Sequence, residues 1–149
     1  MGRIIPSGVH YAMDPFGDGL LVSDGHHNRL LYVTLDGKIS ERMAFDNIVP
    51  TGLAVADEMV YVAEAGPSPH LPEDGKVVAF EADAPTATEI ASGAQLLVDV
   101  EIGSDGTIYA LSQGNFPEGA AGCAGAIEEP AEEPAQPNGR IVGTLTPHL

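Results

Sequence analysis

The sequence predicts an all-β fold, a β-propeller of four-stranded antiparallel blades, of which the chain holds about three. Gly and Pro, 18 and 12 residues, make up about a fifth of the 149 residues, so turns are frequent. Short β-rich runs lie between the turns, and no stretch keeps a helical period over three turns. The pattern also repeats: Asp24 and Glu64 are 40 positions apart, and Glu64 and Ser112 are 48 apart, which is the length of a propeller blade.

Each repeat is expected to contain an inner strand A, followed by strands B, C and D as successive hairpins. Strand A is predicted at 9–13, 52–56 and 97–102, and strand B at 20–25, 60–66 and 108–112. Strand C is predicted at 29–33, 76–80 and 140–144, and strand D at 38–45 and 86–91. The turns from A to B fall at 14–19, 57–58 and 103–106, where Asp105-Gly106 between alternating hydrophobic residues is a strong hairpin signal.

The domain organisation that follows is one partial propeller over residues 1–149. Its blades cover about 9–46, 50–93 and 96–149, and the third lacks strand D. Since a propeller ring needs at least four blades, we expect the chain to form part of a larger, six-bladed ring, which two copies paired as a homodimer would complete. Residues 114–139 interrupt the third blade with five acids, four prolines and no base, a composition typical of a mobile acidic loop. Cys123 lies in that loop, and a lone cysteine forms neither an intramolecular disulfide nor a cysteine-based zinc site.

The charge balance limits the partners. The chain has 22 acids and 6 bases, a net charge of −16, so nucleic acid and anionic membrane surfaces are disfavoured. No run of 18 apolar residues predicts a membrane span, and the N-terminal residues lack the apolar stretch of a secretory signal. The nucleotide-binding, zinc-protease, nucleophile-elbow and EF-hand motifs are all absent from the sequence.

The B-to-C connections are the predicted binding face, for a small molecule or a protein. They lengthen from about five to twelve to twenty-eight residues, and insertions at one equivalent position of a repeat fall on one face. The same rim is expected to carry Asp46, Asn47 and Thr51. The ligand-binding candidates are neutral or titratable polar residues of these connections: Asp24, His26, His70, Gln113 and Asn115. His26, with its neighbour His27, either serves a ligand or forms a solvated turn, and the prolines around His70 either position it or merely end a loop.

A second set of candidates concerns a divalent cation. Glu64 ends a strand that is expected to reach the channel mouth, while Asp99 and Glu101 alternate along an inner strand. Carboxylate oxygens of this kind bind Ca²⁺ or Mg²⁺. The alternative is that these acids simply face solvent.

Several stretches of the sequence resemble one family. The segments are 50–55 (PTGLAV), 60–66 (VYVAEAG), 69–77 (PHLPEDGKV), 96–101 (LLVDVE), 106–114 (GTIYALSQG) and 137–140 (PNGR). Together they resemble the ScyD/ScyE family of NHL-like propeller proteins over about residues 9–144. The resemblance implies a six-bladed propeller that is secreted or periplasmic, and it transfers no catalytic residue.

The favoured function is therefore a non-catalytic or accessory binding propeller that uses the B-to-C face. One alternative is a metal-assisted lyase or lactonase, because such enzymes resemble this architecture and hold a divalent cation near the channel mouth. Another is a purely structural interaction module, since fold alone does not choose among these functions.

Overall fold

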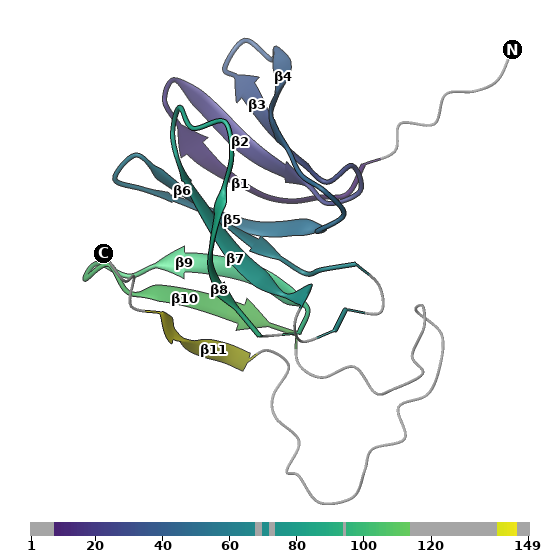
Figure 1. Cartoon of the computed structure of the whole chain (residues 1–149). Coiled ribbons are helices and arrows are strands. Elements are labelled where there is room, and N and C mark those ends of the chain that lie inside the picture. The colour runs from purple at the N-terminus through teal and green to yellow at the C-terminus, as the bar shows by residue number, and fades with distance from the viewer. Residues whose placement is uncertain (1–7, 68–69, 72–73, 94, 114–139, 146–149) are drawn as a thin grey trace, which may run out of the picture.

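The computed structural model describes residues 8–67, 70–71, 74–93, 95–113 and 140–145, and arranges them in three antiparallel sheets (Figure 1). The first sheet contains β1 (His10–Phe16), β2 (Gly19–Asp24), β3 (Arg29–Thr34) and β4 (Ile39–Ala44). The second contains β5 (Pro50–Ala56), β6 (Met59–Glu64), β7 (Lys76–Glu81) and β8 (Thr88–Ser92). The third contains β9 (Leu97–Ile102), β10 (Ile108–Ser112) and β11 (Arg140–Leu145). The predicted acidic loop at 114–139, with Asn115 and Cys123, lies outside the described residues.

The expected all-β, antiparallel organisation is confirmed, and in each sheet the strands pair in the order of the chain. The pairing also has the same register in each repeat. The last residue of the second strand lies opposite the first residue of the third strand: Asp24 opposite Arg29, Glu64 opposite Lys76, and Ser112 opposite Arg140. The three segments are therefore structural repeats.

The first turn lies later than the sequence predicts. The expected turn at 14–19 is wrong in its first half, because β1 continues to Phe16 and the chain reverses at Gly17 and Asp18. Pro15 pairs with Leu20 inside this strand. Proline is tolerated there because β1 is an edge strand of its sheet, where one side of the backbone needs no hydrogen-bond donor.

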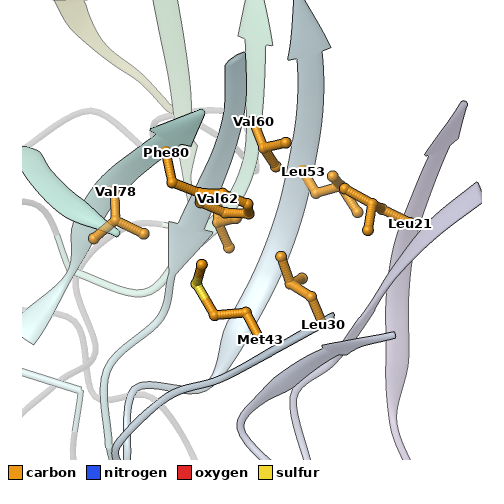
Figure 2. Close-up of a cluster of buried hydrophobic side chains, with 8 residues drawn as sticks. All are labelled: Leu21, Leu30, Met43, Leu53, Val60, Val62, Val78 and Phe80. Atoms are coloured by element: carbon orange, nitrogen blue, oxygen red, sulfur yellow. The ribbon is translucent and has the colours of Figure 1, made fainter. Parts of the chain in front are cut away.

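Large side chains fill the space between the first and second sheets (Figure 2). The first sheet contributes Leu21, Leu30 and Met43, and the second contributes Leu53, Val60, Val62, Val78 and Phe80. Burying a side chain of this size stabilises the fold by about 1.5–3 kcal/mol. A second core joins the second and third sheets and uses smaller residues: Ala54, Ala63, Val77, Leu97, Val100, Ile108 and Ala110.

Hydrogen bonds join successive sheets near the beginnings of β5 and β9. The Ser23 hydroxyl donates to the backbone carbonyl of Thr51 at 2.5 Å, and the Thr51 hydroxyl lies 2.9 Å from the carbonyl of Leu97. Both residues are buried. Gly52 allows a close approach between β5 and β9, since a Cβ atom at this position would lie only 2.3 Å from the Cα atom of Asp99. These contacts hold β1–β2, β5 and β9 in a fixed succession.

An outer contact reinforces the packing of the first two sheets. The Arg42 guanidinium of β4 donates through Nη2 to the carbonyls of Ala82 and Ala84, at 2.6 and 3.0 Å. It also lies over the Phe80 ring, 5.4 Å from the centroid, at a distance suited to a cation–π interaction. The two sheets are thus joined at both their inner and outer strands.

We expect Thr51→Val to lower the free energy of unfolding by about 1–2 kcal/mol, because the isosteric side chain leaves the carbonyls of Ala63 and Leu97 without the hydroxyl donor. Urea denaturation monitored by circular dichroism measures the change. Thr88→Val, on the exposed β8, is the matched control and is expected to leave the midpoint unchanged. Equal effects of the two variants contradict the assigned role of Thr51.

Candidate functional site

The connections between the second and third strands lie at the same end of the strands in every sheet. We call this end of the three sheets, which is distinct from their outermost strands, the B–C edge. There, the end of each second strand pairs with the start of the first strand: Asp24 with His10, Glu64 with Pro50, and Ser112 with Leu97. The next residue along then donates a backbone hydrogen bond to the residue before the first strand: Gly25 to Val9, Ala65 to Val49, and Gln113 to Leu96. The repeats therefore place equivalent residues side by side along this edge.

In the first sheet, a buried acid holds two cationic or potentially cationic groups at the B–C edge. Asp24 is only 1% exposed, and its Oδ2 atom lies 3.1 Å from Arg29 Nε and 2.8 Å from His27 Nδ1. Arg29 also reaches Glu41 on the fourth strand, with Nη1 3.6 Å from a carboxylate oxygen. Burial by itself raises the pKa of Asp24, but the hydrogen bonds from His27 and Arg29 outweigh burial and hold this pKa below its ordinary value.

The structure assigns the fixed imidazole to His27 rather than to His26. Because Nδ1 of His27 faces a carboxylate, this nitrogen carries the proton, and Nε2 of the neutral ring is a hydrogen-bond acceptor. His26 packs edge-on against the His27 ring, with centroids 4.7 Å apart and planes at 75°. From the sequence, His26 is the candidate and His27 is its neighbour, and the three-residue spacing from Asp24 to His27 is the signal that could have identified the partner.

The second sheet has the same succession of a buried acid, a base and a second acid across its strands, but the pKa of the buried acid shifts in the opposite direction. Lys76 takes the place of Arg29, and Glu89 takes the place of Glu41, because Val78 pairs with Glu89 as Leu31 pairs with Glu41. Lys76 Nζ lies 2.7 Å from Glu89 and acts on Glu64 through its charge. Burial dominates at Glu64, which is 3% exposed, and raises its pKa to about 7, while the attraction of Lys76 opposes the rise.

His70, from the proline-containing B–C connection of the second sheet, is held by the backbone. Its Nδ1 atom lies 3.2 Å from the carbonyl oxygen of Ala65, so this nitrogen too carries the proton and donates it to the backbone. Gln113 is exposed at the equivalent edge of the third sheet. Asn115 lies outside the described residues. Thr51, expected on the rim, is instead buried and binds backbone carbonyls.

The B–C edge also concentrates backbone strain. Among the described residues at this edge, four other than glycine have left-handed backbone angles: Asn28, Val49, His70 and Leu96, with φ of 52°, 52°, 62° and 49°. This conformation is costly for a β-branched residue such as Val49. Asn28 Oδ1 partly compensates by accepting hydrogen bonds from the backbone N–H groups of Ile48 and Val49, at 3.2 and 2.8 Å. Strained residues of this kind cluster at functional sites.

The three acids predicted to bind a cation are not brought together. Glu64 alternates with Val60 and Val62 and thus lies on the face of the second sheet that packs against the first. Glu101 follows Val100, which packs between the second and third sheets, and is exposed on the other face. The Asp99 carboxylate accepts the backbone N–H of Val100 at 3.0 Å. In the part of the chain that the structure describes, no group of three His, Cys, Asp or Glu residues is placed to hold a metal ion.

No protein-family model matches the chain, and no curated protein matches it. The resemblance to the ScyD/ScyE family therefore stays a prediction. Over the described ranges, the structure contains no helix that is both long and apolar enough to cross a membrane.

The first testable consequence concerns Asp24. Its lowered pKa contributes stability that is present above its ordinary pKa of 3.8 and is lost as the pH falls through the lower value of the folded protein. We expect Asp24→Asn to cost about 2 kcal/mol at neutral pH, where charged hydrogen bonds to Arg29 and His27 are removed, and less in strong acid. Urea denaturation at both pH values measures this. Asp36→Asn removes the exposed pair with Lys38 and is expected to have no measurable effect.

Glu64, at the equivalent position, is expected to respond to pH in the opposite direction. The unfolded chain ionises this residue near pH 4.5, whereas the folded protein holds the proton until about pH 7. Its contribution to stability is thus fully present below pH 4.5 and is lost as the pH rises through 7, by about 3 kcal/mol in all. We expect Glu64→Gln to gain stability relative to the wild type over this interval.

The difference in free energy of unfolding between Glu64→Gln and the wild type, measured by urea denaturation at several pH values, tests this directly. Other titrating groups are common to both proteins and cancel in the difference. Glu101→Gln, which changes an exposed carboxyl of β9, is the matched control. A difference that stays constant between pH 4.5 and 7, or one that Glu101→Gln reproduces, contradicts the assigned titration of Glu64.

Proposed function

We propose that the chain supplies three blades of a β-propeller and acts as a binding or accessory protein, with a ligand or partner held at the B–C edge. A role outside the cytoplasm is part of the proposal and rests on the resemblance to the ScyD/ScyE family. One observation carries the binding function. Along this single edge the repeats place ionisable side chains that are fixed by hydrogen bonds, together with residues whose backbone is strained.

Three features support the propeller arrangement. The sheets are successive up-and-down meanders, as propeller blades are. They pack face to face through two separate cores, so the second sheet is covered on both faces. Contacts between successive sheets join β1 to β5 and β5 to β9, the first strands, which are the innermost strands of a propeller blade.

The chemistry of the B–C edge favours a ligand that donates hydrogen bonds. His27 and His70 are each fixed through Nδ1, by the Asp24 carboxylate and the Ala65 carbonyl respectively. In the neutral His27 ring Nε2 is therefore an acceptor whose orientation is set before binding. A hydroxyl or amine of the ligand provides the complementary donor, and the preorganised ring lowers the entropic cost of binding it.

The opposite edge of the second sheet offers an internal comparison. An open hollow of about 500 Å³ lies there, lined by Asp57, Glu58, Met59, Glu81, Ala82 and Asp83. Its side chains are mostly acidic and come from turns, and a cluster of acids alone does not define a binding site. This hollow therefore serves as the reference surface for a binding experiment.

The proposal is tested by nuclear magnetic resonance titration of the full chain with a library of small sugars, polyols and amines. We expect shifts of backbone amide signals at 24–28, 64–66, 70–71 and 112–113, and unchanged signals at 57–58 and 81–83. His27→Ala is expected to weaken binding about 3- to 10-fold, the value of one neutral hydrogen bond. His70→Ala removes a side chain of the same B–C edge and is also expected to weaken binding. Glu64→Ala is expected to leave the affinity intact.

Two results would overturn the proposal. One is binding confined to the hollow at residues 57–58 and 81–83. The other is an affinity that both histidine variants leave unchanged. A calorimetric titration with Ca²⁺ and Mg²⁺ tests the metal-assisted alternative separately, and saturable heat that disappears in Glu64→Ala would favour that alternative.

A further inference from the structure

The face of the first sheet that points away from the second sheet is mostly apolar, with the charged residues Asp24, Arg29 and Glu41 at its B–C edge. Its apolar residues alternate with those of the core shared with the second sheet, and they come from all four strands: Met13, Pro15, Leu20, Val22, Leu31, Val33 and Ile39. Exposure is high on the outer strands, where Met13 is 69% and Ile39 67% exposed, whereas Leu20, Val22 and Val33 are half-buried and Leu31 is buried. We call these seven residues the open face.

Each central residue of the open face has a buried counterpart in the second sheet. Met13, Val22 and Leu31 pair across the first sheet as Leu53, Val62 and Val78 pair across the second. Leu20 and Val33 likewise correspond to Val60 and Phe80. All five counterparts belong to the core in Figure 2. The contrast in exposure is large on the first strand, where Leu53 is 6% and Met13 69% exposed, and disappears on the third strand, where Val78 is 7% and Leu31 8% exposed. The open face therefore has the pattern of a surface that another sheet covers.

The third sheet presents the corresponding surface, on which Tyr109 pairs with the exposed Glu101 as Leu21 pairs with Asp14 in the first sheet. In the first sheet, Leu21 of β2 points toward the second sheet and packs in its core. The residue at the same register position in the third sheet is Tyr109 of β10, three positions before Ser112 as Leu21 is three before Asp24. Tyr109 is 39% exposed, between the buried Ile108 and Ala110. Thus the third sheet carries an aromatic side chain where a further sheet would pack.

The two surfaces of one chain point away from each other. The second sheet lies between the first and the third, because β5 contacts both β1 and β9 (Figure 1). The third sheet of another copy has no such restriction. Two copies joined in this way make two identical contacts related by a two-fold axis, which closes the assembly at six sheets, a number typical of propellers.

We propose that the open face is the docking surface for the third sheet of a second copy of this chain, with Tyr109 of one copy packed near Met13 of the other. The proposal rests on the propeller arrangement proposed above and is independent of what the B–C edge binds. A failure of the ligand titration leaves it intact, whereas a monomeric chain overturns it and leaves the ligand site testable.

Sedimentation velocity of the full chain at micromolar concentration tests the association. We expect a species of two 15.4-kDa chains. Met13→Glu places a charge in the centre of the open face and is expected to convert this species to monomers. Leu35→Glu is the matched control, since Leu35 is 85% exposed in the turn after β3 and lies outside the open face. Monomeric wild-type protein, or a dimer that Met13→Glu leaves intact, overturns the proposal.

Cross-linking tests the orientation and does not depend on how Met13→Glu folds. Chains carrying Met13→Cys and chains carrying Tyr109→Cys, each in a Cys123→Ser background, are mixed and treated with a short bismaleimide, since packed sheets lie about 10 Å apart. We expect the cross-linked dimer in the mixture and not with either chain alone. Cross-linking of Met13→Cys chains to one another indicates that two open faces meet, and overturns the proposed head-to-tail contact.

Discussion

The arrangement of the sheets depends on the hydroxyl groups of two buried residues, Ser23 and Thr51. Each hydroxyl donates from one repeat to a backbone carbonyl of the next, and Ser23 also accepts the backbone N–H of Ala12. Because both bonds are made to carbonyl oxygens rather than to side chains, they fix the separation of the first strands without specifying which residues surround them. Gly52 makes the same approach sterically possible.

The B–C edge shows how one sequence pattern gives two electrostatic environments. In the first sheet, the planar guanidinium of Arg29 contacts both acids on either side, and Asp24 stays ionised although it is buried. In the second, the ammonium of Lys76 pairs with Glu89, and the buried Glu64 keeps its proton to about pH 7. A single exchange of basic residue, together with the extra donor His27, thus accompanies a large difference in how the two acids titrate.

Much of the fold is predictable from the sequence because the strands alternate and the repeats are in phase. The eleven strands of the described residues lie where the apolar runs and turn residues indicate, apart from Pro15, whose edge position tolerates a residue that normally ends a strand. The site is less predictable. Glu41 and Glu89 lie on fourth strands, and only the register across three strands brings them to Asp24 and Glu64. Position in a loop likewise could not distinguish His27 from His26, since hydrogen-bond partners decide their roles.

The unequal size of the side chains in the two cores has a consequence for how the protein tolerates change. Between the second and third sheets, Ala54, Ala63 and Ala110 leave no space for extra methylene groups, so enlargement is the damaging substitution there. Between the first and second, Leu30, Met43 and Phe80 occupy large volumes, so truncation is damaging because it opens a cavity. The two interfaces between successive sheets therefore exclude opposite changes in side-chain volume.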